Sequence, residues 1–167
     1  MIRKTGVFAG IQYGGIAGGS KECQDAIVRL LQFGDRVSLA RVLTKKNTHC
    51  LLLTVNEVAL VGIKSGFASG YGGGGPHAFS YVLALLHAHS AEIEEYQVDE
   101  DVIERLDRSA LTVSDIDRLD SAKPVRPNRW AEYVFEDDWE RGESGMLWGE
   151  FKPVIPLPLS EVRSKSV

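Results

Sequence analysis

The chain has 167 residues, a formal net charge of −4 and hydrophobic residues at 44% of its positions. This composition is that of an ordinary globular protein and excludes a chain that is disordered over its whole length. Apolar runs are short, as from Val82 to Leu86, so we expect no membrane-spanning segment and no membrane partner. Cys23 and Cys50 lie far apart and form no Cys-x-x-Cys pair, which favours a reducing, cytoplasmic location.

Charge is divided unevenly along the chain. Residues 1–64 carry nine Lys or Arg against four Asp or Glu, whereas residues 65–120 carry three against eleven. An acidic half repels phosphate backbones, so we expect no general nucleic-acid binding. The basic part either pairs with the acidic part inside the fold, which is the favoured interpretation, or meets an anionic partner.

Residues 6–19 contain six glycines and are expected to be loose. Ser20 is a suitable N-cap for a helix over 21–33, in which apolar residues recur at helical spacing. Three short apolar runs follow, at 37–43, 50–55 and 58–63. They predict an antiparallel meander with a tight turn at Asn56 and Glu57, although the segment 36–43 could equally be a helix.

A glycine-rich turn, Ser65 to Gly75, precedes the next predicted helix, 77–89. Pro76 suits the first helical position, and Phe79, Leu83 and Leu86 form part of a broad apolar stripe typical of a central, buried helix.

A strand is predicted over 92–98, followed by two acidic helices. Asp99 is the expected N-cap of the first, and Thr112 with Asp115 has the spacing of a capping box for the second.

Together these elements predict an α+β fold in which an antiparallel meander and a further strand pack on a central buried helix, with acidic helices after it. Residues 1–123 are expected to form this core domain. Residues 124–167 are expected to form an irregular tail, rich in aromatic residues and proline, that packs on the core or on a partner.

Two glycine patterns resemble nucleotide-binding motifs only in part. Gly14 and Gly19 have the spacing of a phosphate-binding P-loop, but Ser20 precedes Lys21, so both side chains would point in the wrong directions. Residues 70–75 contain Gly-x-Gly-x-x-Gly, which keeps a Rossmann-like dinucleotide binder as a further alternative. No strand–helix alternation follows it, which weighs against that alternative.

The glycine-rich turn could nevertheless bind a phosphate or a nucleotide-like anion. Consecutive glycines allow backbone N–H groups to converge, and a helix N-terminus adds partial positive charge. The simpler interpretation, glycines that serve turn geometry alone, is favoured over it. The candidate ligand-binding residues are Lys64, Ser65, Ser69, Gly70, Tyr71, Gly72, Gly73, Gly74, Gly75 and His77.

No catalytic, metal or cofactor site is predicted. His77 would lie near Ser80 and Tyr81, but no acidic residue is placed to orient its ring. His87 and His89 are two positions apart on different helix faces, which does not suit a shared metal ion.

Two functional hypotheses remain. The favoured one is a non-enzymatic protein-interaction module, such as a small acidic immunity or accessory protein of a bacterial complex, with another protein as its partner. The alternative is a small-ligand binding or sensing domain that uses the turn 65–77. The candidate interaction surface comprises Glu104, Asp107, Trp130, Trp139 and Trp148.

Overall fold

A mixed sheet of five strands forms the middle layer of the molecule. The computed structural model describes residues 6–139. Within them the strands are β1 (Ile11–Gly14), β2 (Val37–Lys45), β3 (Thr48–Val55), β4 (Ala59–Ala68) and β5 (Glu92–Gln97), in the spatial order β1-β4-β3-β2-β5. Strands β2, β3 and β4 pair antiparallel, whereas β1 pairs parallel with β4 and β5 parallel with β2.

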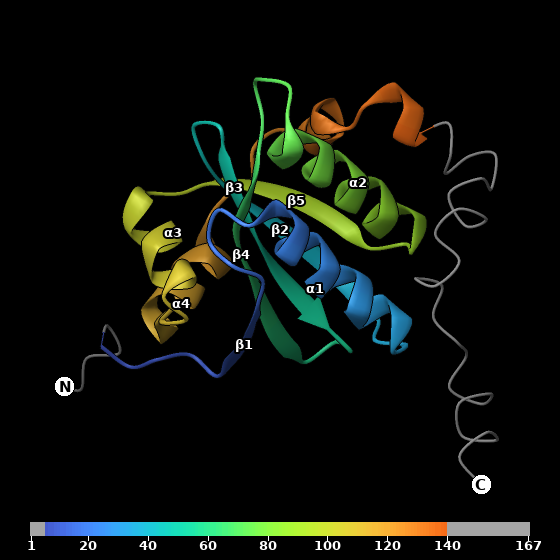
Figure 1. Ribbon diagram of the computed structural model, residues 1–167. Helices are drawn as coiled ribbons and strands as arrows, with labels where there is room; N and C mark the ends of the chain where they lie inside the picture. Colours follow the sequence, from blue (N-terminus) through green and yellow to red (C-terminus); the bar gives the residue numbers. More distant parts are fainter. Residues whose placement is uncertain (1–5, 140–167) are drawn as a thin grey trace, which may run out of the picture.

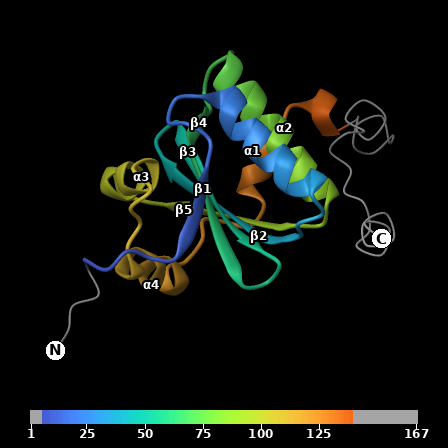
Figure 2. The same cartoon turned by 60° about the horizontal axis from the view of Figure 1, so that its bottom comes forward.

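Helices cover both faces of this sheet. Figures 1 and 2 show α1 (Ser20–Gln32) and α2 (Gly74–Ala88) side by side on one face, and α3 (Glu100–Asp107) and α4 (Val113–Ser121) on the other. A short 3₁₀ helix, η1 (Arg129–Tyr133), contacts α2 and β5. The predicted α+β fold, with its antiparallel meander and acidic helices, is therefore confirmed.

The larger of two hydrophobic cores lies between the sheet and the helices α1 and α2. In α2, Phe79, Leu83 and Leu86 have no exposed surface, which confirms the prediction of a central, buried helix. The second core lies between the sheet and the helices α3 and α4, and Leu43 and Leu106 are fully buried in it.

The segment that could equally have been a helix is the strand β2. Its Ala40 and Val42 belong to the core under α1 and α2, whereas Leu43 belongs to the core under α3 and α4. A strand that is buried on both faces lacks the alternation of polar and apolar residues by which strands are predicted, which is why the sequence left it open.

Two predictions about the N-terminal segment were wrong. Residues 6–19 are not all loose, because they contain β1, whose Ile11 to Gly14 pair with Leu60 to Ile63 of β4. A parallel strand of four residues with two apolar side chains has too little pattern to be recognised. Ser20 is the first residue of α1, and Gly19 is the N-cap.

The glycine-rich turn is shorter than predicted. Residues 65–68 belong to β4, and α2 begins at Gly74, so Pro76 occupies its third position instead of its first. Gly73 is the N-cap with a φ of +151°, a conformation that side chains rarely adopt. The sheet is mixed and not doubly wound, so the Rossmann-like alternative is wrong.

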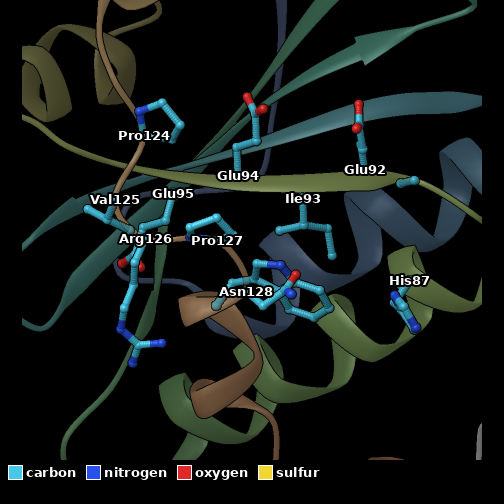
Figure 3. Close-up of a pocket in the computed structure, with 12 residues that line it drawn as sticks. His87, Glu92, Ile93, Glu94, Glu95, Pro124, Val125, Arg126, Pro127 and Asn128 are labelled. Atoms are coloured by element: carbon cyan, nitrogen blue, oxygen red, sulfur yellow. The ribbon is translucent and has the colours of Figure 1, made fainter.

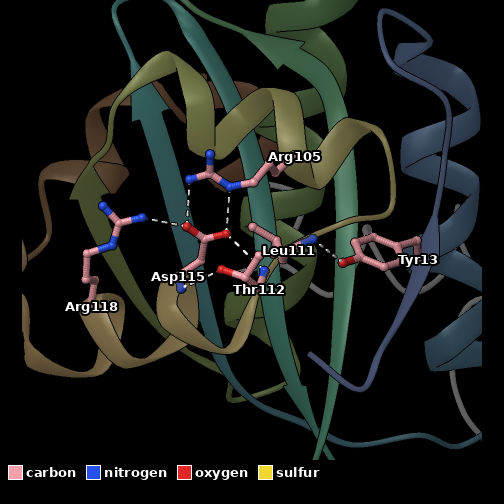
Figure 4. A network of polar contacts seen from close by, with 6 residues as sticks. All are labelled: Tyr13, Arg105, Leu111, Thr112, Asp115 and Arg118. Carbon is pink, nitrogen blue, oxygen red and sulfur yellow. Dashed lines mark hydrogen bonds and ion pairs between the residues drawn. The ribbon is translucent and has the colours of Figure 1, made fainter. Parts of the chain in front are cut away.

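Three other predictions, of one turn and of the starts of two helices, are confirmed. Asn56 and Glu57 both have positive φ in the turn between β3 and β4, and Asp99 is the N-cap of α3. Thr112 and Asp115 form the predicted capping box at the start of α4 (Figure 4).

Candidate functional site

The residues predicted around the glycine-rich turn are divided among several environments. Lys64 and Ser65 lie inside β4, near an irregularity in its pairing with β3. The backbone N–H and the Oγ of Ser65 both donate to the carboxylate of Asp107, at 2.8 and 2.5 Å. Asp107 is therefore used inside the fold, whereas Glu104, on the same helix, is exposed.

The tip of the turn lies beside the first turns of two helices. A Cβ added at Gly74 would lie 3.4 Å from the Oγ of Ser20, so α1 and α2 begin next to each other. The N-terminal amides of both helices bring partial positive charge to this edge. Gly70, Tyr71 and Gly72 are exposed in the same turn. Anion binding here stays a prediction.

Among the described residues, His77 forms no hydrogen bond with a serine side chain. Its exposed ring lies against that of Phe135, with 5.0 Å between centroids. Ser80 is buried and donates to the carboxylate of Asp138 at 2.5 Å, and it accepts the N–H of Phe135 at 2.8 Å. A different histidine, His49, is hydrogen-bonded to a serine, Ser69.

A chain of hydrogen bonds runs from the turn into the larger core. The Oγ of Ser69 lies 2.7 Å from Nε2 of His49, and Nδ1 of the same ring lies 2.9 Å from Oγ1 of Thr44. Thr44 donates in turn to Oε2 of Glu95 at 2.6 Å. Four side chains from β2, β3, β5 and the turn are thus connected in one line, and all but Ser69 are buried.

Two residues of η1 contact Glu95, the buried end of this chain of hydrogen bonds. Tyr133 donates its hydroxyl to Oε2 of Glu95 at 2.5 Å, and Nε of Arg129 lies 3.5 Å from Oε1. Burial and the hydrogen bond to Glu95 raise the pKa of Tyr133 to about 12, so the hydroxyl keeps its proton. Burial, with the positive charge of Arg129, lowers the pKa of His49 to about 4, so its ring is neutral at pH 7.

The sequence analysis did not predict this chain of hydrogen bonds, although the pair Thr44 and His49 could have been recognised from the sequence. Thr44 and His49 are opposite each other in the tight hairpin between β2 and β3, so their proximity follows from that register. Glu95 joins them because β5 pairs parallel with β2, and no local pattern indicates such a pairing.

A groove runs along the outer edge of β5 (Figure 3). It has a volume of about 460 Å³ and lies between the strand and residues 124–130. Figure 3 shows Glu92 and Glu94 on one side of β5 and Ile93 on the other. The predicted interaction residue Trp130 forms part of its wall but is only 6% exposed.

The aromatic residues of the predicted tail pack on α2 where they are described. The ring of Trp130 lies 5.8 Å from that of Trp139 and 5.5 Å from that of His87. Trp148 lies outside the described residues.

The comparisons with known proteins concern the fold alone. No protein-family model matches the chain, and no curated protein matches its sequence. Among solved structures, a chain of respiratory complex I from Thermus thermophilus is similar, with a TM-score of 0.52 and 19% identity over 71% of this chain and 98% of that one. At this identity the similarity shows a shared fold.

Two features are absent from residues 6–139. Within this range, no helix combines the length and the apolar character needed to cross a membrane. Nor does the same range contain a group of three or more His, Cys, Asp or Glu side chains that could hold a metal ion.

Proposed function

We propose that this protein is an interaction module that binds a basic segment of another protein along the outer edge of β5. The observation that carries the proposal is the groove of about 460 Å³ beside this edge strand. Extended segments commonly bind proteins by adding a strand to the edge of a sheet, because backbone hydrogen bonds supply affinity and side chains supply specificity.

The backbone of β5 leaves hydrogen-bonding groups for such a strand. The carbonyl of Glu95 accepts the N–H of Val125 at 2.8 Å, so residue 95 presents its backbone groups away from β2. In a parallel pair the backbone direction alternates, so Ile93 presents its N–H and C=O to the same side. Among the described residues, neither group of Ile93 has a backbone partner on that side.

Charge favours a basic partner over a second copy of this chain. Glu92 and Glu94 lie along the edge, and two such edges would repel each other. The negative potential continues past the end of β5, where exposed carboxylates begin the next helix: Asp99, Glu100, Asp101 and Glu104. Lysine or arginine side chains at alternate positions of an added strand would all face Glu92 and Glu94.

The narrower form of the proposal is an immunity or accessory protein of a bacterial complex. A small chain with a net charge of −4 suits a protein that binds a basic partner. The complex I chain adds only that a similar fold occurs within a multiprotein assembly. Residues 124–130 close one side of the groove, and the division into a core of residues 1–123 and a tail of residues 124–167 is kept as part of the proposal.

Site-specific photocrosslinking tests the proposal. A photoreactive amino acid at Glu92 should crosslink a co-purifying protein, and the crosslinked peptide of that protein should be rich in Lys or Arg. The same amino acid at Glu57, an exposed acid in the β3–β4 turn, is the matched control and should give none. Glu92→Lys should reduce recovery of the partner more than Glu104→Lys does. Equal crosslinking from both positions, or a crosslinked peptide without basic residues, would refute the β5 edge as the interface.

A further inference from the structure

We infer that Ser69 is a nucleophile for acyl transfer, with His49 as its general base, and that its substrate is a small uncharged ester. The inference rests on the hydrogen-bonded chain from Ser69 to Glu95 and on the pocket that Ser69 lines, and it is independent of the groove on β5.

The donor and acceptor of each hydrogen bond in this chain follow from the carboxylate of Glu95 at its buried end. A carboxylate only accepts hydrogen bonds, so the hydroxyl proton of Thr44 points to Glu95. Oγ1 of Thr44 must then accept a proton from Nδ1 of His49, which leaves Nε2 with its lone pair facing Ser69. Ser69 therefore donates to His49, and this is the arrangement in which a base removes a serine proton.

The ring of His49 is held firmly in this orientation. It stacks on Phe79 with 4.4 Å between centroids and lies 4.8 Å from the ring of Tyr133. A positioned base needs such support, because small displacements reduce the rate of proton transfer. At pH 7 the ring of His49 is neutral, so the lone pair on its Nε2 can accept the proton of Ser69.

Ser69 lines a pocket of about 270 Å³ together with Gly70 and Tyr71 of the glycine-rich turn. Its walls are mainly apolar and aromatic, from Tyr71, Pro76, Tyr133 and Phe135, with Glu132 at the rim. This lining suits a small uncharged substrate and disfavours an anionic one.

The start of α2 lies close to the end of β4 that precedes Ser69. A Cβ added at Gly75 would lie 3.0 Å from the Cβ of Ala68, so the first turn of α2 packs against the residue before Ser69. The partial positive charge of this helix N-terminus favours negative charge that develops near it. Of α2 itself only Pro76, which has no N–H, lines the pocket, so the stabilisation comes from the helix dipole and not from a direct hydrogen bond to the helix.

The reaction balances without any further reagent except water. Oγ of Ser69 bonds to the carbonyl carbon of the ester as its proton passes to Nε2 of His49. The tetrahedral anion then expels the alcohol oxygen, which takes the proton back from His49 and leaves an acyl group on Ser69. Water repeats both steps and releases the carboxylic acid. Burial and the charge of Arg129 oppose the transient imidazolium, whereas Glu95 favours it, so His49 is a weak base and the ester needs a good leaving group.

A fluorophosphonate probe tests the assignment, because it reacts with activated serines by displacement of fluoride. We expect the probe to label Ser69, identified by peptide mass mapping, and Ser69→Ala to abolish the label. Ser65→Ala is the matched control, since Ser65 is also half-buried but bonds to the carboxylate of Asp107 instead of a histidine. His49→Gln should slow labelling about 100-fold, the usual contribution of a general base.

A second variant protects the test against misfolding. Thr44→Val keeps the shape of the side chain but breaks the link between His49 and Glu95, and it should slow labelling at least tenfold while the protein remains folded by circular dichroism. Hydrolysis of p-nitrophenyl acetate should follow the same order among the variants. Two results would overturn the inference: labelling of Ser69 no faster than that of Ser65, or unchanged labelling in Thr44→Val. Either would mean that the hydrogen bonds from Ser69 to Glu95 serve the fold alone.

Discussion

The guanidinium of Arg105 donates two hydrogen bonds to the buried carboxylate of Asp115, from Nε at 2.8 Å and from Nη2 at 2.7 Å (Figure 4). This pair joins α3 to α4. Burial opposes ionisation of Asp115, but hydrogen bonds from Arg105, Thr112 and Arg118 outweigh it and hold the pKa of the carboxyl well below its usual range. The carboxylate is thus charged, buried and satisfied from three sides.

Arg105→Met should lower the free energy of unfolding by about 3 kcal/mol, because it removes the main partner of a buried charge. Arg118→Met is the matched control. Its guanidinium also reaches Asp115 at 2.7 Å, but its side chain is 62% exposed, so the loss should be within about 1 kcal/mol. Urea denaturation of both variants checks this, and equal losses would mean that the bidentate geometry contributes nothing special.

His49 should make stability depend on pH. Unfolded, its pKa is near 6.5, and in the fold it is about 4, so between these values the unfolded chain binds a proton that the folded chain does not. The free energy of unfolding should therefore fall by about 3 kcal/mol as the pH drops from 6.5 to 4, and this contribution should change no further below that.

Chemical denaturation at a series of pH values measures this slope. His49→Gln should reduce it, because this substitution removes the ring whose pKa differs between the folded and unfolded states. Part of the slope should remain in His49→Gln, because burial also lowers the pKa of His89. A slope unaffected by His49→Gln would contradict the prediction.

Leu83→Ala tests the central position of α2. Leu83 is fully buried in the core that also contains residues of α1, the sheet and η1, so the substitution should leave a cavity and cost about 2–5 kcal/mol. Thermal or urea unfolding measures the loss. A loss below about 1 kcal/mol would contradict the central, buried position of α2.

The glycines before α2 should differ in their tolerance of alanine. Gly73 has a φ of +151°, and an added Cβ would lie 3.2 Å from the ring of Tyr71. Gly73→Ala should therefore cost about 1–2 kcal/mol in unfolding free energy. Gly74→Ala, whose Cβ would make an ordinary contact with Ser20, should change it by less than about 0.5 kcal/mol. Reversed effects in a thermal melt would contradict this geometry.

The sequence by itself determined the elements whose signals are local. The helical spacing of Phe79, Leu83 and Leu86 predicted a buried helix, and the capping box of Thr112 and Asp115 predicted the start of α4. The meander followed from three consecutive apolar runs, because antiparallel strands joined by tight turns pair with their neighbours in the chain.

Only the tertiary structure decided which distant segments pair. β1 and β5 add to the sheet as parallel strands, and nothing in the residues 11–14 or 92–97 specifies their partners. The chain from Ser69 to Glu95 depends on that pairing, since β5 brings Glu95 to Thr44 from 51 positions away. Periodicity and capping act over a few residues, whereas the meeting of side chains from separate strands is set by how the whole sheet packs between its helices.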